Sequence, residues 1–209
     1  MINFLFSSIL LSPVTLEPVQ TNKQKMAVAF PWTFEKGNRT ARTLAVTTAE
    51  EIARTADYAS VPNDVAAAAW TRLKLPMPRY GTMPSMATLS KFARELHASK
   101  VLFGSVAWHT RSIWVNAGPK TISTATVTAC VYDAASNKIV YQKNRVKGRS
   151  DEKSNGYKIA AAILITPLVT AVSGGPATPQ EQRAVQIGMG NAFNDWVNPV
   201  TRAKSRSGN

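Results

Sequence analysis

Three strand-like stretches follow one another between Lys100 and Arg149, and this order limits the folds open to the chain. The stretches are KVLFGSVAWHTRSIWV (100–115), TISTATVTACVYD (121–133) and KIVYQKNRVKGR (138–149). Each is rich in β-branched or aromatic residues, and the links between them, NAGPK and AASN, are rich in turn-forming residues. Because consecutive strands joined by short turns pair antiparallel, the sequence predicts a β-meander.

The residues before this meander alternate between strand and helix patterns. The predicted elements are a strand over 26–30 that Pro31 ends, a helix over 41–56, a strand over 57–61, and helices over 64–75 and 85–96. A strand–helix–strand–helix–strand order followed by a meander predicts an α/β fold. We expect one mixed β-sheet with helices packed on it.

A long uncharged run lies near the carboxyl end. Fourteen residues from Ile159 to Val172 carry no charge, and Gly174-Gly175-Pro176 follows shortly after. A membrane-spanning helix needs about 20 apolar residues, so we expect a buried apolar helix over 158–173. Its packing or interaction candidates are Ile163, Leu164 and Leu168. Packing inside the domain is favoured, and contact with a second copy or a membrane surface is the alternative.

A second carboxy-terminal helix is predicted over 179–198. Thr178-Pro179-Gln180-Glu181 is a capping-box sequence, with proline at the first helical position and a glutamate that can reach back to the cap amide. Val185, Met189 and Phe193 recur at helical spacing behind it. The two segments together predict a carboxy-terminal helix pair.

The chain divides into three parts. Residues 1–24 form an apolar leader-like segment and linker, residues 25–200 a single α/β domain, and residues 201–209 a basic flexible tail. The apolar stretch from Ile2 to Leu11 has the length of a signal-peptide core, although an extra segment packed on the domain is the alternative. We therefore expect an exported, periplasmic or envelope-associated protein that is not an integral helical membrane protein.

The charge balance favours anionic partners. The chain has 25 Lys and Arg against 12 Asp and Glu, a net charge of +13, which suits nucleic acid, an anionic lipid surface or an acidic envelope polymer. Because side chains alternate along a strand, one face of 138–149 carries cations about 6.6–7 Å apart. This predicted ladder, an anion-binding candidate, consists of Tyr141, Lys143, Arg145, Lys147 and Arg149. The alternative is a solvated edge strand whose charge prevents aggregation.

Two tryptophans on the first long strand are interaction or packing candidates. Trp108 and Trp114 are six residues apart and should share a face. A tryptophan pair can stack on bases or sugars, but it more often anchors a core or an oligomer contact. We favour the core or contact interpretation.

Residues suited to catalysis are scarce. The chain has two histidines, His97 and His109, and one cysteine, Cys130, which sits in an alternating strand pattern typical of packing. No metal-ligand spacing, nucleophile elbow or phosphate loop is present. We therefore predict no catalytic residues, no metal, no cofactor and no enzymatic activity; an uncharacterised enzyme is the least favoured alternative.

Several motifs resemble a known family. KMAVAFPWTF, KFARELHASKVLFGSV and ACVYDAASNKIVYQKN, spread over about residues 25–145, are similar to motifs of the α/β domain shared by the curli-secretion lipoprotein family and the TolB amino-terminal domain. The resemblance implies an envelope module that binds and assembles. No lipid-bearing cysteine is present, so we do not expect a lipoprotein.

The function expected from these observations is that of a non-enzymatic, envelope-associated binding or assembly module. It would act through the apolar carboxy-terminal helices and the basic strand face. Its partner would be another protein or a second copy of the chain, with an anionic polymer or lipid surface possible as well. A nucleic-acid-binding protein that uses the basic ladder is the main alternative.

Overall fold

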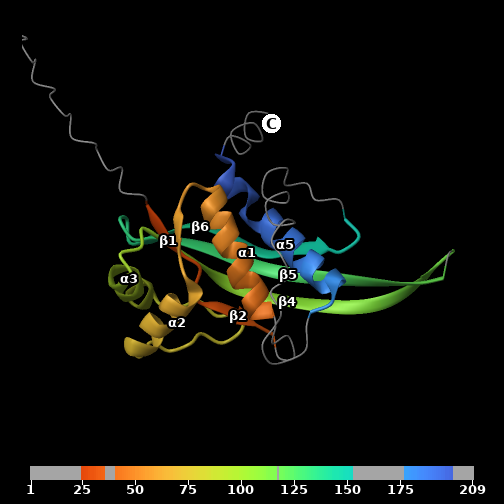
Figure 1. Cartoon of the computed structure of the whole chain (residues 1–209), viewed down its shortest axis with the longest axis horizontal. Coiled ribbons are helices and arrows are strands. Elements are labelled where there is room, and N and C mark those ends of the chain that lie inside the picture. The colour runs from red at the N-terminus through yellow and green to blue at the C-terminus, as the bar shows by residue number, and fades with distance from the viewer. Residues whose placement is uncertain (1–24, 36–40, 117, 153–176, 200–209) are drawn as a thin grey trace, which may run out of the picture.

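The computed structural model describes residues 25–35, 41–116, 118–152 and 177–199. Within these residues a mixed sheet of six strands is packed against helices, which confirms the predicted α/β class (Figure 1). The strands are β1 (Met26–Val28), β2 (Trp32–Phe34), β3 (Ala59–Val61), β4 (Lys100–Val115), β5 (Gly118–Asp133) and β6 (Lys138–Arg149). The helices are α1 (Ala41–Thr55), α2 (Asn63–Arg72), α3 (Met86–Glu95) and α5 (Pro179–Val197).

The sheet combines parallel and antiparallel pairs in the order β3-β1-β4-β5-β6, with β2 also paired to β4. The short strands β1 and β2 both run parallel to β4, and β3 runs parallel to β1. From β4 onward the strands pair antiparallel as a meander. The strands of the meander are therefore joined by short turns. The parallel strands need longer connections, which here contain helices.

The strand predicted over 26–30 is present as the shorter β1, which ends before Pro31, but the sequence did not predict the second short strand, β2, after Pro31. The Phe30–Pro31 peptide bond is cis. Pro31 has no N–H to donate to a ladder, but its carbonyl oxygen accepts a hydrogen bond from the Gly104 N–H at 3.3 Å. The chain thus stays beside β4, and β2 pairs Trp32 with Gly104.

Helices α1 and α5 cover one side of the sheet, here called the closed face (Figure 1). Thr178 caps α5 and Glu181 completes the capping box, as the sequence predicts. Val185, Met189 and Phe193 on α5 are fully buried in the core cluster of this face. Of the two hydrophobic cores in the described residues, the one on the closed face is the larger.

Helices α2 and α3 cover the other side, here called the open face, only at the end where β4 begins. Phe30, Trp70 and Phe92 form an aromatic cluster there, with ring centroids between 4.9 and 5.8 Å apart. Phe103 and Cys130 supply the sheet side of this cluster. Burial raises the pKa of the Cys130 thiol to about 12, so this cysteine is an unreactive core residue.

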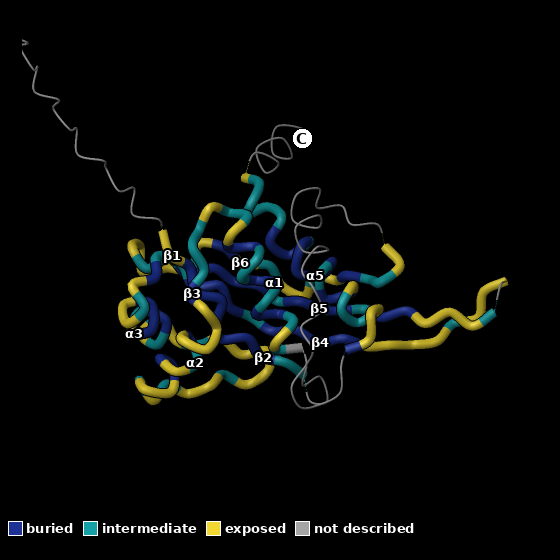
Figure 2. Tube along the Cα trace, in the orientation of Figure 1, coloured by how far each residue is buried: buried dark blue, intermediate teal, exposed yellow. Residues whose placement is uncertain are grey.

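The β4–β5 hairpin extends beyond the helices of both faces (Figure 2). Its strands pair along their whole length, from Lys100 opposite Asp133 to Val115 opposite Gly118. The pairs near the helices are buried, whereas most residues from His109 to Thr121 are exposed. We call residues 109–116 and 118–121 the hairpin tip.

Strand β6 and helix α5 approach each other at two glycines. A Cβ atom added to Gly148 would lie 2.1 Å from the backbone nitrogen of Gly188 and 2.6 Å from the carbonyl oxygen of Ala184. A Cβ added to Gly188 would meet a methyl group of Val127 at 3.0 Å. The first contact is with backbone, which cannot rotate away, and the second is with a side chain that can adjust.

We expect Gly148→Ala to lower the free energy of unfolding by about 3 kcal/mol, the upper end of the usual range for overpacking, because α5 must move away from the sheet. Gly188→Ala is the matched control, since the better helix propensity of alanine offsets the milder crowding. Its change should stay within about 1 kcal/mol. Urea denaturation of both variants measures the difference, and equal stability would show that the backbone contact is not tight.

Candidate binding surfaces

A β-bulge interrupts the basic strand β6. Lys143 pairs with Ala129 and Val146 pairs with Val127, so two residues of β6, Asn144 and Arg145, oppose Thr128 alone. Arg145 has a φ of 52°, and its backbone N–H donates to the Thr128 hydroxyl at 3.3 Å. A bulge adds one residue to a strand and reverses the side that later residues face.

Before the bulge, the candidate residues of β6 face the closed side. The Tyr141 hydroxyl donates to the Ala192 carbonyl oxygen of α5 at 2.5 Å, and its ring stacks on Phe193. The Lys143 ammonium lies 2.9 Å from the Asp195 carboxylate. Tyr141 is thus buried against α5 and is not a stacking residue at a sheet edge.

After the bulge, the candidate residues face the open side. Val146 and Gly148 now take the closed face, against α5, and Lys147 and Arg149 pair with Thr126 and Thr124. The predicted ladder with one shared face is therefore wrong. The physical reason is the bulge, which places its members on two sides: Tyr141 and Lys143 on the closed face, and Arg145, Lys147 and Arg149 on the open face.

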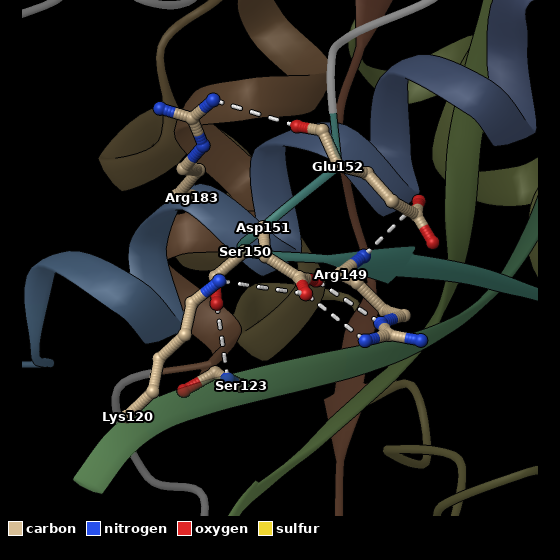
Figure 3. A network of polar contacts seen from close by, with 7 residues as sticks. All are labelled: Lys120, Ser123, Arg149, Ser150, Asp151, Glu152 and Arg183. Atoms are coloured by element: carbon tan, nitrogen blue, oxygen red, sulfur yellow. Dashed lines mark hydrogen bonds and ion pairs between the residues drawn. The ribbon is translucent and has the colours of Figure 1, made fainter. Parts of the chain in front are cut away.

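Arg149 is engaged in a polar network at the end of β6 (Figure 3). Its guanidinium donates two hydrogen bonds of 3.0 Å to the Asp151 carboxylate, and the Lys120 ammonium lies 4.0 Å from the same group. The hydrogen bond from Arg149 is the main cause that lowers the pKa of Asp151. An anion would have to displace this carboxylate before it could bind Arg149.

The same network fastens the end of β6 to its neighbours. Ser123 and Ser150 exchange two hydrogen bonds, of 3.1 and 2.9 Å, and the Arg183 side chain of α5 donates to the Glu152 carbonyl oxygen at 3.4 Å (Figure 3). These contacts join β5, β6 and α5. We interpret the network as structural.

Beyond the cover of α2 and α3, the open face contains a cavity of about 440 Å³, here called the open-face hollow. The hollow crosses the sheet from β6 through β5 and β4 to the end of β2. Seven of its nine lining residues have polar side chains. The lining residues are Glu35, Tyr80, Gly81, Ser105, Ala107, His109, Thr126, Thr128 and Arg145.

Charges of both signs act inside the hollow. The His109 Nε2 atom lies 3.4 Å from Glu35 Oε2. Burial is the main cause that raises the pKa of Tyr80; Glu35 raises it further, and Arg145 lowers it. Tyr80 therefore lies within electrostatic reach of both charged groups. Sequence reasoning identified only Arg145 of this set, because the other residues come from separate loops and strands.

The hollow contains a serine, a histidine and a carboxylate, but they do not form a nucleophilic triad. Ser105 and His109 lie on the same face of β4 four residues apart, a separation of about 13 Å between their backbones. A general base must be within about 3 Å of the nucleophile or joined to it by one water. His109 is also 75% exposed. Within the described part of the chain, no group of three or more His, Cys, Asp or Glu could hold a metal ion.

The two tryptophan candidates have different surroundings. Trp108 is 7% exposed and belongs to the closed-face core. Trp114, on the same side of β4, lies in the hairpin tip and is 83% exposed. Ile163, Leu164 and Leu168 lie outside the described residues. Among the described helices, none is long and apolar enough to cross a membrane.

Comparison with known proteins gives partial structural likenesses only. No family model and no curated protein matches the chain. Among solved structures it is similar to the lipoprotein GNA1162 of Neisseria meningitidis, with 13% identity, a TM-score of 0.44, and coverage of 67% of this chain and 95% of that one.

Two further structures are similar at the same level. The LpoB C-terminal domain of Escherichia coli is 17% identical, with a TM-score of 0.38 and coverage of 62% of this chain and 83% of that one. The hypothetical protein CT253 of Chlamydia trachomatis is 15% identical, with a TM-score of 0.41 and coverage of 84% and 99%. None of the three is named as a curli-secretion or TolB protein, so that resemblance stays a prediction.

Proposed function

We propose that this protein is a non-enzymatic assembly module of the cell envelope that binds another protein through the hairpin tip. The observation that carries the proposal is the exposure of Trp114 at the far end of a hairpin that extends past both layers of helices (Figure 2). Tryptophan is enriched among the residues that dominate binding energy at protein interfaces.

The chemistry around Trp114 indicates the kind of partner. Val115 beside it is 42% exposed, so the tip presents an apolar end. The sequence from 109 to 121 contains Arg111 and Lys120 and no Asp or Glu. Both cations lie on the face of the hairpin opposite Trp114, and Lys120 also lies 4.0 Å from the Asp151 carboxylate. A pocket for the indole ring surrounded by acidic residues would complement this surface.

A different protein suits the tip better than a second copy of this chain. Two identical tips would bring Arg111 and Lys120 of both copies together, and the whole chain carries a net charge of +13. Like charges at a contact suppress association. We therefore propose an acidic partner protein.

The envelope location is supported by sequence features. The apolar stretch from Ile2 to Leu11 has the length of a signal-peptide core. The motifs in residues 25–145 resemble those of envelope proteins. A contact function fits both features, because the proposed module needs a surface and no reacting groups.

A photo-crosslinking amino acid at position 114, introduced in cells, should give one discrete adduct with another protein. The same amino acid at Val65, an exposed residue of α2 near the other end of the molecule, is the matched control and should give none. Substitution of Arg111 by glutamine should weaken the adduct at 114, because the partner is acidic. An adduct of twice the chain mass would identify a second copy and contradict the proposed partner.

Fractionation of cells should place the native protein in the envelope or periplasm, with a mass lower than that of the full chain because the leader is removed. Mass spectrometry of the purified native protein measures the amino terminus. Recovery from the cytosol with Met1 in place would contradict the envelope location. It would not change the interpretation of the crosslinking result.

Nucleic-acid binding is the second candidate, because two cations of the open face are not neutralised. Among the described residues, no carboxylate lies within ion-pair distance of Arg145 or Lys147, whereas Lys143 and Arg149 are paired. Of the predicted ladder, Arg145 and Lys147 are therefore the two side chains that could contact phosphates. Two contacts of this kind give weak binding with a shallow salt dependence.

Two double variants with the same change of charge test this candidate. Arg145→Gln with Lys147→Gln should reduce the salt dependence of single-stranded DNA binding by about 1.4 ions, because each phosphate contact on a single strand releases about 0.7 counterion. Lys143→Gln with Arg149→Gln should change it by less than about one. Titration by fluorescence anisotropy at several salt concentrations measures both, and wild-type binding without salt dependence would eliminate the candidate.

A further inference from the structure

We infer that the open-face hollow is a binding site for a small sugar-like anion, a hydroxyl-rich molecule with one phosphate or carboxylate group. This inference is independent of the contact proposed for the hairpin tip. It rests on the shape of the hollow, on the position of Arg145 and on the distribution of hydroxyl and carboxylate groups across the sheet.

The hollow has the size of a ligand site. Its volume of about 440 Å³ lies within the range of about 300–1,000 Å³ typical of small-molecule pockets. Its floor is formed by neighbouring strands, where Ser105 pairs with Thr128 and Ala107 with Thr126. A floor of paired strands is rigid, so the polar groups on it are held in place before a ligand arrives.

Arg145 is the anion-binding group of the hollow. The bulge turns it to the open face, and the hydrogen bond from its N–H to Thr128 fixes the backbone in a conformation that non-glycine residues rarely adopt. In the described residues its guanidinium has no carboxylate partner. Guanidinium groups form two parallel hydrogen bonds with a carboxylate or phosphate, so an anionic group of a ligand is the natural partner.

Hydroxyl groups form the middle of the site. Ser105, Thr126 and Thr128 lie between Arg145 on β6 and Glu35 after β2. Each hydroxyl can donate and accept, which suits a ligand with several hydroxyls of its own. Tyr80 adds a phenol hydroxyl and an aromatic ring on which a sugar ring can pack.

Glu35 defines the direction of the ligand. Three strand spacings separate it from Arg145, about 14 Å between their backbones. A carboxylate repels an anion and accepts hydrogen bonds from hydroxyl or amino groups. The ligand would therefore place its phosphate or carboxylate at Arg145 and its donor groups at Glu35, beside His109.

A series of four probes tests the assignment on the full chain: glucose, glucose 6-phosphate, glucosamine 6-phosphate and inorganic phosphate. We expect glucose 6-phosphate to bind at least about tenfold more tightly than glucose, because hydrogen bonds to charged groups are stronger than those between neutral groups. Glucosamine 6-phosphate should bind more tightly still, because its ammonium group can reach Glu35. Calorimetry gives the affinities, and two-dimensional NMR should show shifts at the amides of Thr126 and Thr128.

Variants distinguish the site from general attraction to a basic protein. Arg145→Gln should weaken the binding of glucose 6-phosphate at least about tenfold, whereas Lys147→Gln, the matched loss of a neighbouring charge outside the hollow, should change it less than about twofold. Glu35→Gln should remove the advantage of glucosamine 6-phosphate. Thr126→Leu should block the hollow and abolish binding, with its thermal unfolding showing that the chain is folded.

Three results would overturn the inference. These are equal affinity of Arg145→Gln and wild type, equal affinity for inorganic phosphate and glucose 6-phosphate, and undiminished binding by the Thr126→Leu variant. Trp114→Ser should leave the affinity for glucose 6-phosphate unchanged, because Trp114 does not line the hollow. Failure of this site and failure of the hairpin contact are therefore separate outcomes.

Discussion

The pairing of Asn144 and Arg145 with the single residue Thr128 is the constraint on which both faces of the meander depend. Before this bulge, Tyr141 reaches the carbonyl oxygen of Ala192 on α5. After it, Gly148 lies on the same face, where α5 comes too close for any side chain. A strand without the bulge would direct Lys147 at α5 and remove Gly148 from it. Because of the extra residue, Tyr141 and Gly148 both contact α5, while Arg145 faces the open side.

Much of the fold follows from local patterns in the sequence. The helical spacing in 41–56, the capping box at Thr178 and the turn-linked strands after Lys100 each predict an element that the structure contains. These signals are local, since each depends on residues a few positions apart. The sequence predicted the strand that Pro31 ends, but it did not predict β2, because β2 depends on pairing with Gly104, which lies far along the chain.

The candidate site was less predictable for the same reason. KNRVK reads as regular alternation, and nothing within it marks the bulge, whose stabilising hydrogen bond comes from Thr128 on β5. The open-face hollow combines residues from the end of β2, the loop before α3 and three strands. Only the topology of the sheet brings Glu35 and Arg145 to one surface. A list of cations could find Arg145, but it could not find the polar groups that surround it.

The residue types along β4 and β5 also change at the point where α2 and α3 no longer cover the open face. Along β5, the open-face positions 124, 126 and 128 are threonines, and the next two are Cys130 and Tyr132. Along β4, the change from Phe103 to Ser105 occurs beside it, since these residues pair with Cys130 and Thr128. The aromatic cluster of α2 and α3 reaches Phe103 and Cys130 and no further. A sheet face that only met solvent would tolerate many residue types, whereas this one changes, at a single line across two strands, from the residues of the apolar cluster to a mainly polar set that contains Ser105 and three threonines. The hollow begins at that line, so the end of the hydrophobic core and the edge of the proposed site are the same boundary.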